Sequence, residues 1–431
     1  MALFIGNINT NPIIDTKHRN YNGSQPTNIK AYGVSFSDMS TNTTATRLYT
    51  AANYKFSFSD TMTKGADDFI ANEAGPFMIR ECATGYNSST GKQEVVAYKG
   101  DSNYSTYLGD KNYDIMIEFP VFYYTRPESL QFVVTSTPGV LGFVASPMHN
   151  RNGKVYDYAY VSKFKLDNNF CSQYNTRPYT TNVKALRDGV RQKGMQLMDY
   201  PTHCMLTILM FIKYGDIQFN TQIIGEHPSN YHLSGISKYI RSYDGSFILG
   251  ESAPNVTLGL ENYTSYPGVW LDGAYSINGD LYVYSDLESF DYDYGFSRMG
   301  VKSGLSSTGN KLLDKDNNFI NVSYGLGPVS SAVYAPYKSL IYVSSAQYAL
   351  LSSSDIANDD DTNIFSTVTI SNNISGVSLI GLIGVGKRLS SRTHSTIAKY
   401  SSPLSYGRVG HSSNSDYAKL AARSMFWRNA L

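Results

Sequence analysis

The segment from Tyr200 to Gly215 constrains the fold more than any other part of the sequence. It reads YPTHCMLTILMFIKYG, with apolar side chains over nearly the whole face of the helix that it predicts. Proline suits the first helical position and glycine the residue after the last, so the segment carries its own start and stop signals. A helix that is apolar on nearly all sides is buried. We therefore expect this helix inside the molecule.

A second helix is predicted just before it. Asn182–Lys193, NVKALRDGVRQK, contains helix-forming residues and places Val183, Leu186 and Val190 at helical spacing, with Gly194 as a plausible stop. The two helices stand together in the middle of a chain whose other segments do not show this period.

Strand and turn patterns fill the remainder. The chain holds 36 Tyr and 20 Phe but only 16% charged residues, with Ser, Asn, Thr and Gly in the polar positions. Tyr113–Tyr124 alternates as a strand, with Pro120 restricting its pairing, and Asn150–Gly153 has the residues of a hairpin turn. Ala31–Leu48 begins as a strand, and short strands return after Gly225. A β-rich chain with two helices mid-chain predicts the α+β class.

The net charge, the apolar runs and the cysteines limit which partners and compartments we expect for this chain. A formal net charge of +1 over 431 residues gives no electrostatic reason to expect nucleic acid or an acidic membrane as partner. The longest apolar run, Cys204–Ile212, is too short to cross a bilayer, and we expect no secretory leader in MALFIGNINTNPIIDTKH. Cys82, Cys171 and Cys204 form no C-x-x-C pair, which favours folding in a reducing compartment.

The stretch GLIGVGKR, Gly381–Arg388, is similar to a phosphate-binding loop. Arg388 stands where the loop needs a Ser or Thr to hold Mg²⁺, and the Ser/Thr-rich sequence that follows ends at Pro403 instead of forming a helix. We therefore interpret these glycines as part of a strand and a bend, with a strand over Gly376–Ile380.

The acidic and histidine groupings do not predict a metal site. His227 and His232 match the spacing of neither a helical zinc pair nor a zinc finger. Asp314–Asn318 has the alternating oxygens of a calcium loop, but Phe319 replaces the glycine of its sharp turn. We expect no cofactor and name no metal ligand or catalytic residue. A calcium ion in a polar loop and two carboxylates on separate loops, as in glycoside hydrolysis, both stay open.

Several sequence motifs follow one another in an order that resembles that of a known class of proteins. The segments YGVSFSDMSTNTTATRL, DIMIEFPVFYY, GFVASPMHNRNGKVYDYAYVSKF, NVKALRDGVRQKG and MDYPTHCMLTILMFIKYGDIQFNTQIIG are followed by LGLENYTSYPGVWLDGAYSINGDLYVYSD. This succession, over Tyr32–Asp286, resembles bacteriophage tail-fibre and receptor-binding proteins with a C-type-lectin-like domain. Such domains look related in fold to formylglycine-generating-enzyme-like domains and to the variable proteins of diversity-generating retroelements.

The resemblance implies a C-type-lectin-like fold and a domain plan. We expect an N-terminal attachment arm over residues 1–30, a small β-rich region over 31–110, and the lectin-like domain with long loops over 111–431. The oxidase chemistry of the enzyme relatives requires a reactive cysteine pair late in the domain, and all three cysteines here precede Met205. We therefore expect a protein that is not an enzyme.

The function implied is host attachment. The chain would be a virion protein, made in the host cytoplasm, which docks onto phage tail or baseplate proteins and recognises a host cell-surface glycan or protein. Such adhesins resemble homo-oligomers, usually trimers, in which weak sites gain by avidity. The alternatives are a structural virion component, such as a capsid fibre, decoration or baseplate protein, and a glycan-degrading enzyme.

The expected contact surface lies in the last thirty residues. Aromatic side chains offer broad contact at low entropy cost, while amides and hydroxyls give adaptable hydrogen bonds to sugars. The candidates for ligand binding are Tyr406, Arg408, His411, Asn414, Asp416, Tyr417, Trp427 and Arg428.

Overall fold

The computed structural model describes residues 29–36, 45–54, 69, 75–125, 127, 131–151, 154–181, 183–215, 233–235, 256–263, 269–277, 280–283 and 421–429, and short strands at 301–302, 306–308, 311–313, 319–321, 333–334, 337–338, 377–382 and 406–409. These residues form mostly β-sheet with two α-helices, which confirms the expected α+β class. No helix among them is long and apolar enough to span a membrane.

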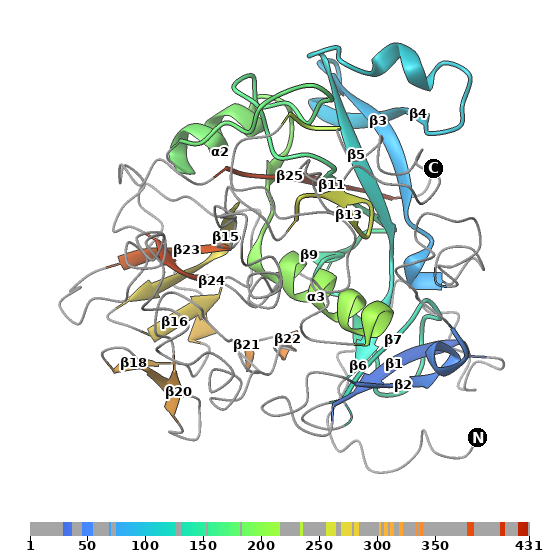
Figure 1. Ribbon diagram of the computed structural model, residues 1–431, viewed down its shortest axis with the longest axis vertical. Coiled ribbons are helices and arrows are strands. Elements are labelled where there is room, and N and C mark those ends of the chain that lie inside the picture. Colours follow the sequence, from blue (N-terminus) through green and yellow to red (C-terminus); the bar gives the residue numbers. More distant parts are fainter. Residues whose placement is uncertain are drawn as a thin grey trace, which may run out of the picture.

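The largest sheet of the described chain has six antiparallel strands in the order β12-β25-β11-β5-β3-β4. Figure 1 shows its strands β3, β4 and β5 beside one another, with β25 running across toward them below α2. The C-terminal strand β25 thus lies between two mid-chain strands. The members are β3 (Arg80–Asn87), β4 (Lys92–Tyr98), β5 (Tyr113–Pro120), β11 (Tyr158–Ser162), β12 (Gln196–Leu197) and β25 (Ser424–Arg428).

A five-stranded sheet lies at the other end of the long β5 strand (Figure 1), in the order β2-β1-β7-β6-β8. It combines strands from either side of residue 110, as the six-stranded sheet also does, so the expected domain limit at residue 110 is not visible as a break between sheets. The expected arm over residues 1–30 lies outside the described residues except for its last two. The members are β1 (Ala31–Ser35), β2 (Thr46–Tyr49), β6 (Tyr123–Thr125), β7 (Gln131–Thr135) and β8 (Val144–Ala145).

The strand expected over Tyr113–Tyr124 is two strands in different sheets. The first, β5, ends at Pro120, and β6 begins at Tyr123. Pro120 has no N–H to continue a ladder, and the Val121 N–H donates to the Asp157 carbonyl at 2.8 Å. The alternating pattern continues through this corner, which is why the sequence did not reveal the change of sheet.

Local turn and cap signals gave correct predictions. Around the expected hairpin at Asn150–Gly153, β9 (Asn150–Arg151) pairs antiparallel with β10 (Lys154–Val155), while residues 152–153 lie outside the described residues. Helix α2 spans Val183–Arg191, within the expected range, and Gly194 adopts a positive φ of 67° after it.

Helix α3 spans Tyr200–Tyr214 and ends at Gly215, as predicted. The Gly215 φ is 67°, and its N–H donates to the Phe211 carbonyl. At the other end the Asp199 carboxylate accepts from the Thr202 N–H at 2.8 Å, a cap that the sequence analysis did not identify.

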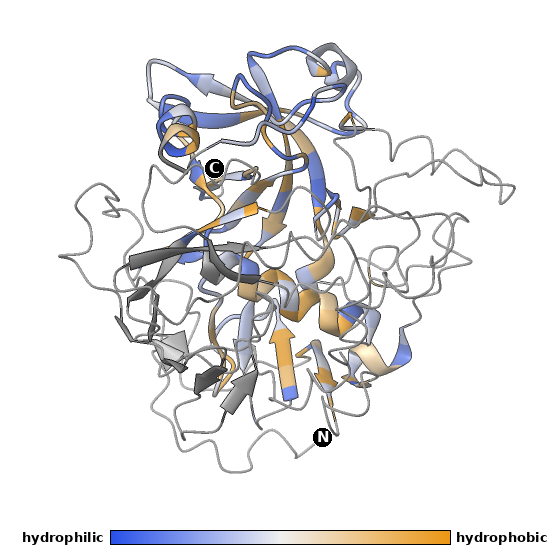
Figure 2. Cartoon of the chain, turned by 60° about the vertical axis from the view of Figure 1, so that its left-hand side comes forward, coloured by the Kyte–Doolittle hydropathy of each residue, from blue (hydrophilic) through white to orange (hydrophobic). Residues whose placement is uncertain are grey.

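Helix α3 lies in the main core. The Phe211 ring contacts Phe36 and, on the five-stranded sheet, Phe132, at centroid distances of 5.4 and 6.1 Å. Near its start, the Thr202 hydroxyl donates to the Met425 sulfur of the six-stranded sheet. Figure 2 shows the hydrophobic colour gathered on α3 and the strands around it. The expected burial of this helix is confirmed.

The later part of the described chain consists of short strands, as expected. Gly381 lies inside β23, opposite Trp270 and Gly407, so the start of GLIGVGKR is strand, whereas 383–388 lie outside the described residues. Five of these strands form one sheet, in the order β17-β16-β15-β23-β24. The remaining elements are β13 (Val256–Thr257), β14 (Leu260–Glu261), β15 (Val269–Ile277), β16 (Asp280–Val283), β17 (Val301–Lys302), β18 (Ser306–Thr308), β19 (Lys311–Leu313), β20 (Phe319–Asn321), β21 (Val333–Tyr334), β22 (Tyr337–Lys338), β23 (Val377–Leu382), β24 (Tyr406–Val409) and the 3₁₀ turns η2 (Thr50–Asn53), η3 (Gly75–Phe77) and η4 (Tyr104–Tyr107).

Candidate functional site

Two of the candidate contact residues have described side chains: Trp427 and Arg428, in β25. Tyr406 and Arg408 are described through their backbone, in β24 beside β23. The other candidates lie outside the described residues: His411, Asn414, Asp416 and Tyr417.

Trp427 and Arg428 lie on opposite faces of the six-stranded sheet. Trp427 is directly opposite Ala159 of β11, and Arg428 is opposite Tyr158. Successive side chains of a strand point to opposite faces. The two neighbours therefore belong to different surfaces, although the sequence analysis grouped them.

Trp427 covers a buried ion pair. Its indole N–H donates to the Met148 carbonyl at 2.8 Å, and its ring lies 4.2 Å from the Arg151 guanidinium carbon. Arg151, which is 3% exposed, donates to the Asp199 carboxylate at 2.6 Å. Because Asp199 caps α3, these contacts of Trp427 support the helix start and point to a structural role.

Arg428 lies in a cluster on the other face, which we call the arginine–tyrosine patch. Its members come from neighbouring strands, and cross-strand pairing places them on one face: Arg80 is opposite Glu118, and Glu118 is opposite Tyr160. The patch consists of Arg80, Tyr98, Glu118, Tyr158, Tyr160 and Arg428.

Glu118 is the centre of the patch. Its carboxylate is 1% exposed and accepts from the Arg80 Nε at 2.7 Å. The hydroxyls of Tyr98 and Tyr160 donate to its other oxygen at 2.8 and 2.6 Å. Charge-assisted hydrogen bonds of this kind are roughly twice as strong as neutral ones. Glu118 therefore fixes the positions of the three side chains around it.

The rim of the patch is accessible and carries surplus positive charge. The Arg80 side chain is 50% exposed, and its guanidinium lies 4.0 Å from the centre of the Tyr98 ring. Tyr98, Tyr158 and Arg428 are partly exposed. The buried Arg428 Nε has no hydrogen-bond partner among the residues that the structure describes. The patch thus holds two guanidinium groups and a single carboxylate.

Three side chains of the patch have shifted pKa values: Tyr98, Tyr160 and Arg80. Burial, together with the hydrogen bond to Glu118, raises the pKa of Tyr98 to about 12. The same causes raise the pKa of Tyr160 well above its ordinary value. Burial acts to lower the pKa of Arg80, but its hydrogen bond and charge interaction with Glu118 raise it. The tyrosines therefore stay hydroxyl donors and Arg80 stays charged.

This arrangement suits a ligand with a polar, partly anionic surface. A guanidinium can bind a carboxylate or phosphate through two parallel hydrogen bonds, and tyrosine rings offer faces for stacking. The alternating sequence YDYAYVSKF is consistent with Tyr158 and Tyr160 on one face of a strand. Arg80, Tyr98 and Glu118 were missed because only strand pairing brings them to Arg428.

No metal centre accompanies the patch in the described part of the chain, where no group of three His, Cys, Asp or Glu could hold an ion. The cysteines Cys82, Cys171 and Cys204 are all described, buried and free of disulfide bonds. The sequences around His227 and Asp314–Asn318 lie outside the described residues.

No protein-family model matches the chain, and no curated protein matches it either.

Proposed function

We propose that the chain is a non-enzymatic bacteriophage virion protein, a tail-associated adhesin that recognises a host cell-surface glycan or protein. The observation that carries the proposal is the arginine–tyrosine patch, in which the partly exposed rings of Tyr98 and Tyr158 and two guanidinium groups share one sheet face. Aromatic faces stack on the apolar faces of sugars, and the N–H groups of a guanidinium donate to their hydroxyls. The resemblance of the motif order to phage receptor-binding proteins supports the same function.

Binding through such a patch would be weak at each copy. A homotrimer anchored to tail or baseplate proteins would present several patches at once, and linked sites gain affinity through effective concentration. The C-type-lectin-like fold and the virion location are parts of this proposal.

Glycan cleavage, the alternative function, would require a suitable pair of carboxyl groups. Glycoside hydrolysis needs two carboxyl groups about 5–10 Å apart on either side of one bond. Glu118 is opposite Arg80 on β3, whereas the neighbouring Glu81 is opposite Ile117 and points to the other face. Glu118 and Glu81 therefore do not form such a pair.

Whole-cell binding tests the proposal. The purified, assembled protein is labelled and mixed with a panel of bacterial strains, with and without the purified surface polysaccharide of each strain. We expect saturable binding to a subset of strains, competed by the matching polysaccharide or lost on protease treatment of the cells. Binding to no strain would contradict the proposal. Shortening of the polysaccharide would instead support the glycan-degrading alternative.

Locating the chain in a virion separates the adhesin from a structural component. An adhesin exposes the arginine–tyrosine patch at the tail periphery, whereas an assembly protein buries it against neighbouring subunits. Labelling with an antibody against the patch, viewed by electron microscopy of intact particles, distinguishes the two.

A further inference from the structure

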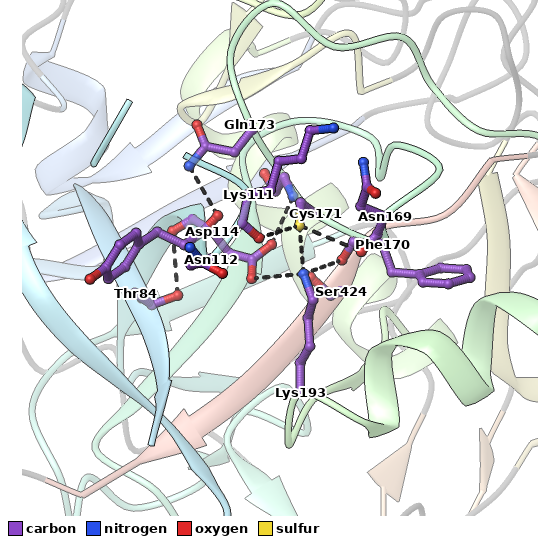
Figure 3. A network of polar contacts seen from close by, with 12 residues as sticks. Thr84, Lys111, Asn112, Asp114, Asn169, Phe170, Cys171, Gln173, Lys193 and Ser424 are labelled. Carbon is purple, nitrogen blue, oxygen red and sulfur yellow. Dashed lines mark hydrogen bonds and ion pairs between the residues drawn. The ribbon is translucent and has the colours of Figure 1, made fainter. Parts of the chain in front are cut away.

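A lysine and a cysteine meet beside the six-stranded sheet, away from the arginine–tyrosine patch. Figure 3 shows the Lys193 ammonium group directed at the Cys171 sulfur and the Asp114 carboxylate. Lys193 follows the last turn of α2, Cys171 lies in the loop after β11, and Asp114 belongs to β5. The Nζ–Sγ distance is 2.6 Å.

The surrounding contacts hold both groups in place. The Cys171 N–H donates to the Asp167 carboxylate at 2.9 Å, and its sulfur lies 2.9 Å from the Lys111 carbonyl oxygen. Lys193 Nζ also donates to the Phe170 carbonyl at 3.2 Å. Cys171 is 0% exposed. The approach of nitrogen and sulfur is therefore a built feature of the fold.

The distance is too short for an ordinary hydrogen bond to sulfur. N–H···O bonds are about 2.9 Å long, and sulfur is a larger acceptor than oxygen. Two single bonds of about 1.5 Å meeting at about 111° hold their outer atoms roughly 2.5 Å apart, and a bond to sulfur is somewhat longer. A nitrogen and a sulfur at 2.6 Å thus have the separation that one bridging atom imposes.

We propose that Cys171 and Lys193 are a modification site at which one oxygen atom joins Sγ to Nζ. The co-reactant is dioxygen. The S–H bond, one N–H bond of the neutral amine and the O–O bond break, while an S–O bond and an O–N bond form. The second oxygen leaves as water with the two released hydrogens. Sulfur and nitrogen each lose two electrons, and dioxygen takes up all four.

Asp114 is placed to take the proton that the lysine must lose first. Its carboxylate lies 3.8 Å from Lys193 Nζ and is 1% exposed, and it accepts from the Ser172 N–H at 2.7 Å. Burial raises the pKa of Asp114 to about 6, although Lys193 acts to lower it. Burial acts to lower the pKa of Lys193 but Asp114 and Cys171 raise it, so the neutral amine that reacts is the minor form and Asp114 is the group beside it that can hold the released proton.

The bridge would tie the end of α2 to the loop after β11. It closes a loop between residues 22 apart, and a cross-link of this kind stabilises mainly by restricting the unfolded chain. A thiol reductant would open it, so stability would depend on redox conditions.

Mass spectrometry of the full chain tests the bridge. Protein purified in air is denatured without reductant, treated with iodoacetamide and digested. We expect a cross-linked peptide pair containing Cys171 and Lys193, about 14 Da heavier than the two peptides together because one oxygen is gained and two hydrogens are lost. A thiol reductant should release both peptides. The pair should vanish in Cys171→Ser and Lys193→Arg and persist in the control Cys204→Ser.

Two results would overturn the proposal. Complete alkylation of Cys171 in the air-purified wild type would show that sulfur and nitrogen only touch. A pair about 2 Da lighter than the sum would show a direct S–N bond instead of an oxygen bridge. Both results come from the wild type, so the test does not depend on whether the variants fold.

Discussion

Replacing Trp427 by alanine should lower the stability of the folded protein, and we expect this effect to be larger than any direct effect on ligand binding. The indole N–H donates to the Met148 carbonyl at 2.8 Å, and losing that hydrogen bond costs about 1 kcal/mol. The contact with the Arg151 guanidinium, at 4.2 Å, contributes about 1 kcal/mol more, because Arg151 is buried. The Tyr156 ring, 6.1 Å away, adds about 0.5–1 kcal/mol. Together these contacts predict a loss of about 3 kcal/mol in the free energy of unfolding.

The matched substitution is one residue away. Arg428→Ala removes a partly exposed side chain whose Nε has no hydrogen-bond partner in the described part of the chain. It should change the free energy of unfolding by no more than about 0.5–1 kcal/mol. Urea unfolding followed by circular dichroism measures both variants. A loss below about 1 kcal/mol for Trp427→Ala, with an unchanged slope, would refute the structural role of this ring.

Two further predictions concern other contacts. The pKa of Glu81 is lowered to about 2 because Lys163 and Lys99 together outweigh the effect of burial, so roughly 3 kcal/mol of stability, present above pH 4.5, is lost as the pH falls toward 2. Urea midpoints from pH 7 to pH 2.5 should show this loss, and Glu81→Gln should flatten it; parallel curves would contradict it. Gly189→Ala should lower the melting temperature despite the helix preference of alanine, because its Cβ would lie 2.2 Å from the Phe170 ring. A higher melting temperature would exclude that contact.

The predictable features of the fold are those encoded in short segments. Both helices follow from apolar spacing and from Gly194 and Gly215, which adopt the positive φ that favours glycine. The hairpin at Asn150–Gly153 follows from its turn residues. Each of these signals acts within a few residues, so it can be read without knowing the rest of the structure.

Long-range pairing could not be predicted in the same way. The insertion of β25 between β11 and β12 depends on Arg423, which is fully buried and donates to the carbonyls of Ser162 and Lys163 at 2.8 and 2.7 Å. Arginine side chains are mostly exposed in proteins, so the sequence gave no indication that Arg423 is buried and holds β25 in place.

The candidate site illustrates the same limit. The sequence placed Arg428 in a contact surface by position near the C-terminus, and the structure puts it on a partly exposed face with Tyr158. It could not show that Trp427 belongs to the opposite face, because that requires knowing that residues 424–428 form a strand. The sequence also could not show that Glu118 contacts Arg80, because the two residues are 38 positions apart in the chain.

The most direct test of the proposed adhesin compares three proteins in one cell-binding titration. The wild type is measured with Arg428→Ala and with Arg177→Ala, a control that removes an exposed arginine outside the patch. Loss of a hydrogen bond to a charged group costs about 1.5–3 kcal/mol, equivalent to at least about tenfold in affinity at each site. The proposal predicts that loss for Arg428→Ala alone, with all three proteins equally folded. Equal binding by all three would contradict the assignment of host recognition to the arginine–tyrosine patch.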